Sequence, residues 1–346
     1  MARWQKILQQ AITSPADLPA HLQPDLPGAA AVTDLYPMRV NPYYLSLIKE
    51  KGDPLWLKAV AQAQELDDLV CVADPLAEEN LSPVTNLVHK YPNRVLFLVT
   101  SQCAMYCRFC TRKRKVGTPG MVISAETMAA GLAYIRTNPQ IKDVLISGGD
   151  PLLLSDERLD WLLGSLRAIP SVEIIRIGSR VPCTLPMRVT MKLCRILKKY
   201  HPLYINTHFN HPREITPEAT LACKRLADAG IPLGCQTVLL KGVNDDAQTM
   251  ATLMAKLLTI RVKPYYLFQG DLTRGTNHFR TSIETGQAIM QQLIGHTSGM
   301  GVPTYAVDGP DGAGKIPLTP NYIQSLGKQL CFTNYQGKTC FYDNGA

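Results

Sequence analysis

The chain has 346 residues, of which 46% are hydrophobic and 18% charged, so a disordered or fibrous protein is excluded. Its net charge of +8 suits anionic ligands or nucleic acid, although solubility alone could account for it. Ten cysteines in a chain of this size fall below the density of a disulfide-stabilised domain. No secretory signal or membrane-length apolar run is present, so we expect a cytoplasmic protein whose cysteines ligate metal, react or pack.

The first 90 residues are rich in proline and predict helices around residues 45–51 and 55–66. From Arg94 onward, short apolar runs alternate with helical periods. The expected strands are residues 95–100, 144–147, 174–178, 203–207, 233–239 and 262–268. Six strand–helix units predict an α/β fold with a parallel sheet, and they are too few for a closed eight-stranded barrel. We therefore expect a partial (β/α)6 barrel with its site at the carboxyl ends of the strands.

Three helix starts can be read from capping residues. Ser155 and Thr216 each precede an acidic or proline-led first turn, as N-caps do. Asn244 or Asp245 is expected to cap the helix that runs to about residue 259.

The first expected strand leads into a loop with the spacing C-x-x-x-C-x-x-C, formed by Cys103, Cys107 and Cys110. Three thiolates can hold three irons of a [4Fe–4S] cluster and leave the fourth iron open to another ligand. A zinc site would need a fourth protein ligand, and none is evident nearby. Simple packing of the three cysteines is the remaining alternative.

This loop resembles the defining motif of the radical S-adenosylmethionine (SAM) superfamily. The resemblance implies that SAM binds the open iron and is cleaved, after one-electron reduction, to methionine and a 5′-deoxyadenosyl radical. The next expected strand ends in Ser147, Gly148, Gly149 and Asp150, which the resemblance assigns to the amino group of SAM. The glycines allow backbone to approach a ligand closely, and Asp150 could accept a hydrogen bond from an ammonium group. Read alone, this stretch is only a turn between strand and helix.

The other cysteines are expected to serve packing or to remain thiols. Cys194 and Cys223 fall on expected helices and Cys235 on an expected strand. Cys331 and Cys340 flank a segment that could be a hairpin, and a disulfide between them has no support in the sequence.

Residues 309–316, GPDGAGKI, nearly match a phosphate-binding P-loop. Ile316 stands where magnesium binding needs Ser or Thr, and Pro317 disfavours the helix that a P-loop requires. A lysine on a glycine-rich loop can instead form a Schiff base with pyridoxal 5′-phosphate (PLP). On spacing alone, Lys315 could equally be a solvated surface lysine.

Motifs spread over roughly residues 35–325 resemble the lysine 2,3-aminomutase family. They include YPNRV at 91–95, CTR at 110–112, RIGSR at 176–180, NTHFNHP at 206–212, GVND at 242–245, KPYY at 263–266, HTSG at 296–299 and KIP at 315–317. The resemblance implies an isomerase that converts L-lysine to β-lysine by 1,2-amino migration, with a [4Fe–4S] cluster, SAM and PLP as cofactors. It also implies a reductant protein such as flavodoxin or ferredoxin, no nucleic-acid or membrane partner, and room for a homo-oligomer.

The resemblance also assigns residues. It places PLP on Lys315 and the PLP phosphate at Arg94. It places the ε-ammonium of the substrate at Asp271 and Asp308, which agrees with the need of a buried cation for opposite charge. A relative that uses glutamate lacks these two acids, so their presence favours lysine. The substrate carboxylate falls to Arg112, whose guanidinium suits a carboxylate.

His208 and Gln236 resemble residues that line the SAM site, while a zinc pair of His208 with His211 is a weak alternative. Relatives with a structural zinc site carry a cysteine where this chain has Asp246, and further cysteines in a longer C-terminal extension. We therefore expect no zinc site, and the oligomeric state stays open.

Three other functions remain as alternatives at this stage. The same chemistry could serve β-lysylation of elongation factor P, or act on a different amino acid. An iron–sulfur protein could instead bind nucleic acid through the basic run at residues 112–115. The expected division is a mostly helical region at 1–90, the partial barrel at 91–298, and the PLP-lysine loop with a short C-terminal extension at 299–346.

Overall fold

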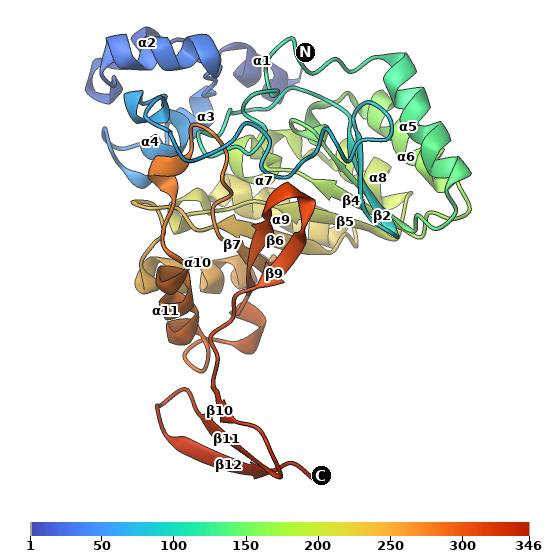
Figure 1. The fold of residues 1–346 in the computed structure, drawn as a ribbon. Helices are drawn as coiled ribbons and strands as arrows, with labels where there is room; N and C mark the ends of the chain where they lie inside the picture. The colour runs from blue at the N-terminus through green and yellow to red at the C-terminus, as the bar shows by residue number, and fades with distance from the viewer. Residues whose placement is uncertain (1, 346) are drawn as a thin grey trace.

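The computed structural model describes residues 2–345 and is built around a nine-stranded sheet whose strands follow one another in chain order (Figure 1). Strands β2 to β8 run parallel, and the edge strands β1 and β9 pair antiparallel with their neighbours. The strands are β1 (Leu87–Tyr91), β2 (Arg94–Leu98), β3 (Asp143–Ser147), β4 (Ile174–Gly178), β5 (Leu203–Thr207), β6 (Leu233–Val238), β7 (Lys263–Phe268), β8 (Thr304–Gly309) and β9 (Gly314–Pro317).

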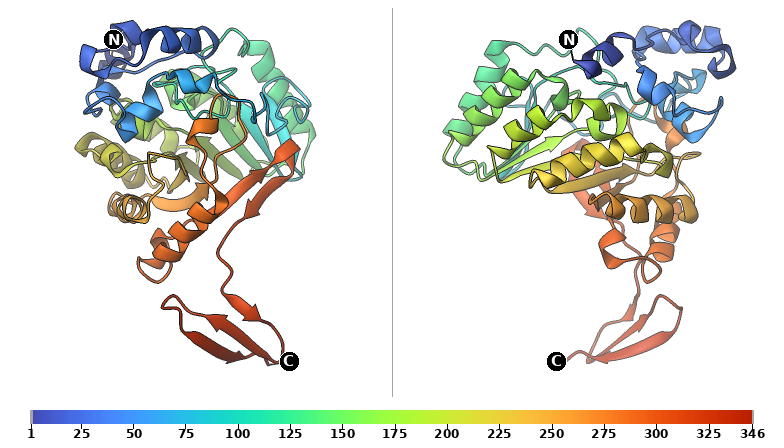
Figure 2. Two further views of the ribbon diagram at one scale, coloured as in Figure 1. Left: turned by 60° about the vertical axis from the view of Figure 1, so that its left-hand side comes forward. Right: turned by 180° about the vertical axis from the view of Figure 1, so that it is seen from behind.

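Six crossover helices connect the parallel strands and lie on the outer side of the curved sheet (Figure 2). They are α5 (Ala125–Thr137), α6 (Asp156–Arg167), α8 (Met191–Lys198), α9 (Pro217–Asp228), α10 (Ala247–Thr259) and α11 (Ile283–Leu293). The six predicted strand–helix units are confirmed, with strand ends displaced by at most two residues. Strands β1, β8 and β9 were not predicted, and they extend the sheet toward closure.

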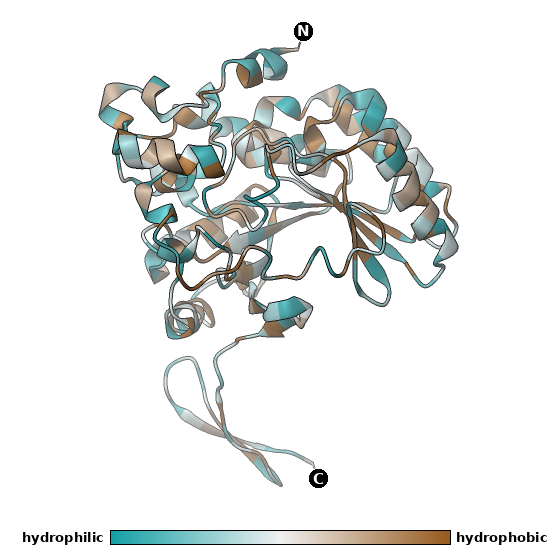
Figure 3. Ribbon diagram, turned by 45° about the horizontal axis from the view of Figure 1, so that its top comes forward, coloured by the Kyte–Doolittle hydropathy of each residue, from teal (hydrophilic) through white to brown (hydrophobic). Residues whose placement is uncertain are grey.

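Alternation along the strands separates a core from an inner cavity. In β3, Val144 and Ile146 are fully buried toward the helices, whereas Leu145 is only partly buried on the opposite face. Helix α6 buries Leu159 and Leu163 completely against the outer face of the sheet, which stabilises the fold by roughly 1.5–3 kcal/mol per side chain. Figure 3 shows the same pattern, with hydrophobic residues along the strands and hydrophilic stretches on the helices.

The capping predictions hold at two helices and fail at a third. Ser155 and Thr216 accept hydrogen bonds from the first turns of α6 and α9, as expected. Helix α10 is instead capped by Asp246, whose carboxylate accepts from Thr249 N at 2.8 Å. Asn244 cannot serve because its buried carboxamide bonds other backbone groups, two of them carbonyls.

The N-terminal region is helical, but its helices are shorter than predicted. They are α1 (Arg3–Gln9), α2 (Leu26–Leu35), α3 (Pro42–Leu45) and α4 (Pro54–Ala59), joined by short 3-10 turns at Pro15–Asp17, Ala20–Leu22 and Ala63–Glu65. The helix expected around residues 45–51 is absent, because a chain reversal with Gly52 at a φ of +85° follows α3. Asp53 then caps α4 through Leu55 N and Trp56 N.

A second sheet of three antiparallel strands stands apart from the barrel in both views of Figure 2. Its strands are β10 (Ile323–Ser325), β11 (Gln329–Thr333) and β12 (Thr339–Asp343), so the predicted hairpin is confirmed. Cys331 lies opposite Phe341, and Cys340 lies opposite Phe332, which places the two thiols on opposite faces of the hairpin. Both are free thiols, and no disulfide joins them.

The domain division stays a prediction. Strands β8 and β9 lie beyond residue 298 and pair with the main sheet, whereas the small sheet begins only at Ile323. Within residues 2–345, no helix is long and apolar enough to cross a membrane.

Candidate active site

A cavity of about 850 Å³ lies inside the curved sheet, near the upper end of the range for ligand sites. It is lined by inward-facing strand residues such as Leu96 and Leu145 and by the loops that follow the strands. Every predicted site residue lines it: Arg94, Cys103, Cys107, Cys110, Arg112, Ser147, Gly148, Gly149, Asp150, His208, Gln236, Asp271, Asp308 and Lys315. Residues separated by more than 200 positions in the chain therefore meet in one space.

The cavity also has lining residues that the sequence analysis did not single out. They are Glu78, Lys90, Tyr91, Arg176, Arg180, Asn206, Tyr266 and Phe268 among others. Their only signal was proximity to the quoted motifs, because several of them stand inside or next to those stretches. Glu78 lay outside every motif and could not have been found in this way.

The loop with the three cysteines is held by the N-terminal region. Tyr106 N donates to Arg39 O at 3.0 Å, and Arg108 N donates to Lys58 O at 2.9 Å. The Arg108 guanidinium also forms a buried ion pair with Glu65 at 2.6 Å. These contacts fix the loop between β2 and the N-terminal helices, so the region before residue 90 shapes the site.

The cysteines suit a cluster better than a single ion. Burial raises the pKa of Cys110 to about 11 and that of Cys103 well above its usual value, so a cation must displace their protons. Among residues 2–345, no three His, Cys, Asp or Glu side chains converge tightly enough for one metal ion. In a [4Fe–4S] cluster each cysteine binds a different iron, so three ligands that are spread apart fit it.

The glycine turn after β3 accommodates the cysteine loop itself. Gly148 has a φ of +127°, which side-chain-bearing residues rarely adopt, and a Cβ added there would collide with Thr100 O. Gly149 N donates to the same carbonyl, and Asp150 N donates to Gln102 O at 2.7 Å. The glycines thus allow two backbone segments to approach each other, a reason that the sequence analysis had not considered.

The expectation that the Asp150 carboxylate accepts from a ligand ammonium is not supported. Its Oδ1 accepts from Leu152 N and from the Ser179 hydroxyl at 2.7 Å. Its Oδ2 accepts from Arg180 N at 2.7 Å and Val181 N at 3.0 Å. With four donors of its own chain, this carboxylate anchors the start of α7 (Val181–Thr184) rather than facing the cavity.

Lys315 and the two predicted substrate acids gather at another end of the cavity. Asp308 in β8 lies directly opposite Lys315 in β9, and their side chains form an ion pair at 2.9 Å. Lys90 approaches Asp308 at 3.6 Å. Burial and the nearby Asp308 raise the pKa of Asp271 to about 7, so this end attracts a further cation.

Aromatic and cationic groups surround Lys315. Arg94 stacks over the Tyr91 ring at 3.9 Å, and the Tyr91 hydroxyl accepts from Lys315 N at 3.2 Å. Tyr266 and Phe268 stack at 4.8 Å between ring centroids, with the Lys315 ammonium 5.1 Å from the Phe268 ring. Lysine, cations and aromatic faces together form a donor set that fits a phosphorylated aromatic aldehyde such as PLP.

Arg112 is held by an acid of its own chain. Its Nε and Nη2 donate to the Glu78 carboxylate at 2.6–2.9 Å, and Glu78 is almost fully buried. Arg114 pairs with Asp74 and Glu79, and Lys115 also pairs with Glu79. The basic run at 112–115 is therefore neutralised within the chain, which disfavours the nucleic-acid alternative.

Two buried polar atoms that line the cavity lack a partner among the described residues. They are His208 Nε2 and Asn206 Nδ2. Burial lowers the pKa of His208 to about 3, with the Arg180 cation adding to the effect, so its imidazole is neutral. Unpaired buried polar groups are costly, and a polar ligand such as SAM would satisfy them.

A curved sheet of parallel strands, with a three-cysteine loop after its first parallel strand and a cavity inside, defines the chain as a radical SAM protein. A profile of the radical SAM superfamily matches residues 97–254, and a profile named for lysine-2,3-aminomutase matches residues 290–345. The superfamily implies an iron–sulfur cluster and SAM.

Similar proteins define the family. The chain is 53% identical to L-lysine 2,3-aminomutase of Methanococcus maripaludis, over 88% of this chain and 71% of that protein. It is 50% identical to L-lysine 2,3-aminomutase of Clostridium subterminale (91% and 77%) and 47% identical to glutamate 2,3-aminomutase of Clostridioides difficile (86% and 72%). The chain belongs to the lysine 2,3-aminomutase family.

Similarity to solved structures is more remote. The crystal structure of Streptococcus suis SuiB bound to S-adenosylmethionine aligns with a TM-score of 0.48 and 12% identity. The alignment covers 64% of this chain and 51% of that chain.

Proposed function

We propose that this chain is a radical SAM, PLP-dependent isomerase that converts L-lysine to β-lysine by moving the amino group between adjacent carbons. The observation that carries the choice of lysine is the acid pair Asp271 and Asp308 beside Lys315. A substrate ammonium between them would be attracted, whereas the side-chain carboxylate of glutamate would meet two like charges. The other acids of the cavity, Glu78 and Asp150, are already paired.

Three groups would bind at separate parts of the cavity. Cys103, Cys107 and Cys110 would hold the cluster, and SAM would lie next to it, within reach of His208. Lys315 would hold PLP. When bound, the cluster and SAM supply a 5′-deoxyadenosyl radical after one-electron reduction, and PLP supplies a conjugated system that stabilises an unpaired electron on the substrate.

The residues of the chain orient the substrate and exclude water. Once the amine of Lys315 is engaged by the cofactor, Asp308 loses that ion pair and its carboxylate becomes available to the substrate's ε-ammonium. Arg112 has one guanidinium edge occupied by Glu78, which leaves its Nη1 side for the substrate carboxylate. Arg94, with Lys90 and Tyr91 nearby, would bind the PLP phosphate. The enclosing sheet would keep water from the reacting carbons.

The electron for the cluster must come from a low-potential one-electron donor, for which flavodoxin or ferredoxin is suitable. A homo-oligomer is compatible with the chain, and no residue of the proposed site depends on it. The structure favours neither catabolism nor elongation factor P modification as the destination of the product.

Anaerobic reconstitution with iron, sulfide, PLP, SAM, reductant and lysine tests the proposal. We expect β-lysine to form, and glutamate offered in its place to be turned over at least about tenfold more slowly, a difference of roughly 1.4 kcal/mol. A fully loaded protein that forms no β-lysine, or that prefers glutamate, would contradict the substrate assignment.

The PLP site has its own test. Lys315→Ala should abolish the visible absorption band of protein-bound PLP while leaving the iron–sulfur absorption in place, because the two sites use different residues. Lys263→Ala is a matched control, since Lys263 lines the same cavity at the start of β7. The assignment fails if Lys315→Ala keeps the PLP band, or if the control loses it.

A further inference from the structure

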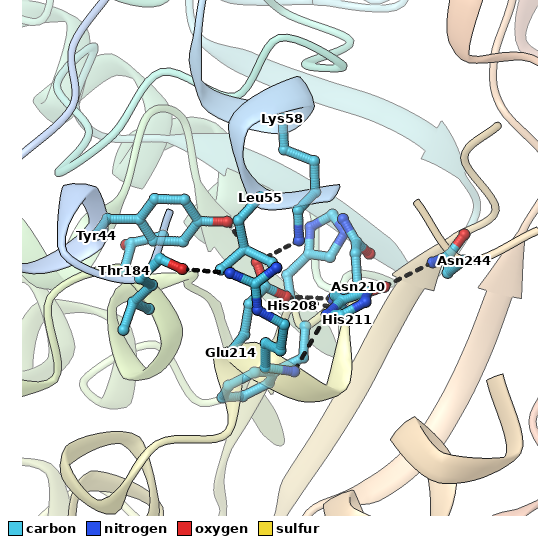
Figure 4. Close-up of polar contacts among 12 residues, drawn as sticks. Tyr44, Leu55, Lys58, Thr184, His208, Asn210, His211, Glu214 and Asn244 are labelled. Carbon is cyan, nitrogen blue, oxygen red and sulfur yellow. Dashed lines mark hydrogen bonds and ion pairs between the residues drawn. The ribbon is translucent and has the colours of Figure 1, made fainter. Parts of the chain in front are cut away.

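A buried group of charges lies directly beneath the cysteine loop (Figure 4). Its centre is Glu214, whose Oε1 accepts from Lys58 Nζ at 2.6 Å, from Arg180 Nη2 at 2.6 Å and from the Tyr44 hydroxyl at 2.7 Å. Its Oε2 accepts from two backbone amides of the segment after β5. Lys58, Tyr44 and Glu214 are fully buried, and Arg180 is 8% exposed.

Arg180 connects this group to the cysteine loop. Its Nη1 donates to Cys107 Sγ at 2.8 Å, and its Nε donates to His208 O at 3.3 Å. Its backbone amide is fixed by Asp150, and its guanidinium lies 5.3 Å from the Phe109 ring. Each nitrogen of the guanidinium therefore has a partner, and one of them is a sulfur of the three-cysteine motif.

The charges leave a local excess of positive charge. Burial would raise the pKa of Glu214, but Lys58 and Arg180 beside it hold that pKa well below its usual range, so the carboxylate is ionised. Two cations and one anion then sum to one positive charge. Burying three ions is expensive, so such a group is poor evidence for a purely stabilising role. An anionic iron–sulfur cluster at Cys107 would provide the missing negative charge.

The physical consequence concerns the reduction of the cluster. One electron from an external low-potential donor takes the [4Fe–4S] cluster from the 2+ to the 1+ state, and the bound cluster becomes more negative by one charge. A hydrogen bond to a ligand sulfur and a nearby cation both stabilise the more negative state, and both raise the reduction potential.

We propose that Arg180, held in place by Glu214 and Lys58, is a positioning residue that raises the reduction potential of the cluster through its hydrogen bond to Cys107. The inference rests on the cluster site of the proposed function, and it does not depend on PLP or on the identity of the substrate. It assigns to the N-terminal helices an electrostatic role, since Lys58 and Tyr44 come from that region.

The experiment is a redox titration of the full chain, reconstituted anaerobically and followed by the EPR signal of the reduced cluster. Arg180→Gln keeps a hydrogen-bond donor but loses the charge, and we expect its midpoint potential to be lower than that of the wild type. A tenfold smaller reduced-to-oxidised ratio at fixed potential corresponds to a shift of 59 mV. Arg180→Lys keeps the charge and should recover part of the shift.

Arg188→Gln is the matched control. Arg188 is as deeply buried as Arg180, but it donates to Leu152 O and Leu154 O and pairs with Asp156, with no sulfur among its partners. We expect an unchanged potential. An Arg180→Gln protein with full iron content and wild-type potential would overturn the proposal, as would an equal shift in Arg188→Gln.

A measurement on the wild type covers the case in which Arg180→Gln does not fold. Protein labelled with ¹⁵N only in the arginine guanidinium should show a ¹⁵N coupling to the spin of the reduced cluster in pulsed EPR. The label must spare the backbone, because Arg112 N donates to Cys110 Sγ at 3.4 Å. Absence of the coupling rejects the hydrogen bond. A shift in potential without β-lysine production would reject the proposed reaction and leave this inference standing, whereas failure of the wild type to assemble any cluster would reject both.

Discussion

At the scale of single residues, the site is organised by which acids are already paired. Asp150 and Glu78 are fully engaged by partners of the chain, whereas Asp308 is paired only with lysines and Asp271 has a raised pKa. The family resemblance named Asp150, Asp271 and Asp308 without distinguishing their states. The difference follows from position, since Asp150 faces a ring of backbone amides and the other two lie against each other.

Asp271→Asn should weaken the use of lysine and stabilise the fold at alkaline pH. We expect kcat/KM for lysine to fall by about 10- to 100-fold, corresponding to the ~1.5–3 kcal/mol of a charged hydrogen bond. In the wild type, kcat/KM should rise as pH passes through about 7 and Asp271 ionises, and the variant should lack this rise.

The stability effect has a defined sign. The pKa of Asp271 is raised by folding from 3.8 to about 7, so its contribution is complete below pH 4 and is lost as pH rises through 7. The variant should therefore have a higher Tm than the wild type at pH 8, with the difference vanishing near pH 4. Asp228→Asn, at an exposed acid, is the control. A lower Tm for Asp271→Asn at pH 8 would contradict the buried-charge assignment.

At the scale of elements, the cysteine loop is determined by its neighbours as much as by its own sequence. The N-terminal helices hold it on one side and the glycine turn after β3 holds it on the other. The six parallel strands were predictable because each is a short apolar run followed by a helical period. Strands β8 and β9 were not, because glycine and proline interrupt the stretch that they form.

Gly148→Ala should disrupt this contact. A side chain at a φ of +127° costs at least about 1–2 kcal/mol, and its Cβ would also collide with the cysteine loop. We expect a lower Tm and less iron per chain after reconstitution than in the wild type. Gly120→Ala is the control, because that glycine lies in an exposed loop with only Thr118 Oγ1 nearby. Normal iron content in Gly148→Ala would show that the loop does not need this close approach.

At the scale of the whole molecule, the barrel and the C-terminal sheet are weakly connected. The small sheet exposes Leu326, Phe341 and Tyr342, and Tyr335 in its turn packs against Gly295 after α11. The cavity residues, in contrast, end with Lys315. The cofactor sites should therefore be complete without the small sheet.

A chain ending at Pro320 tests this division. We expect it to fold and to keep both the iron–sulfur and PLP absorption bands, because no cavity residue is removed. Its Tm should stay within a few degrees of that of the full chain, since the lost contacts with the barrel amount to about 1–2 kcal/mol. Gly295→Ala in the full chain checks the contact with Tyr335 separately. Loss of both absorption bands on truncation would show that the small sheet supports the barrel.

The sequence by itself determined the local features. The spacing of the three cysteines, the lysine on its glycine loop and the succession of strands and helices depend on neighbours in the chain, and pattern reveals them. Only the tertiary structure decided which groups meet. It paired Arg112 with Glu78, engaged Asp150 with backbone amides, moved the cap of α10 to Asp246, and placed Arg180 on Cys107. These contacts join residues from different strands and loops, and their energies depend on burial and distance, which no local pattern records.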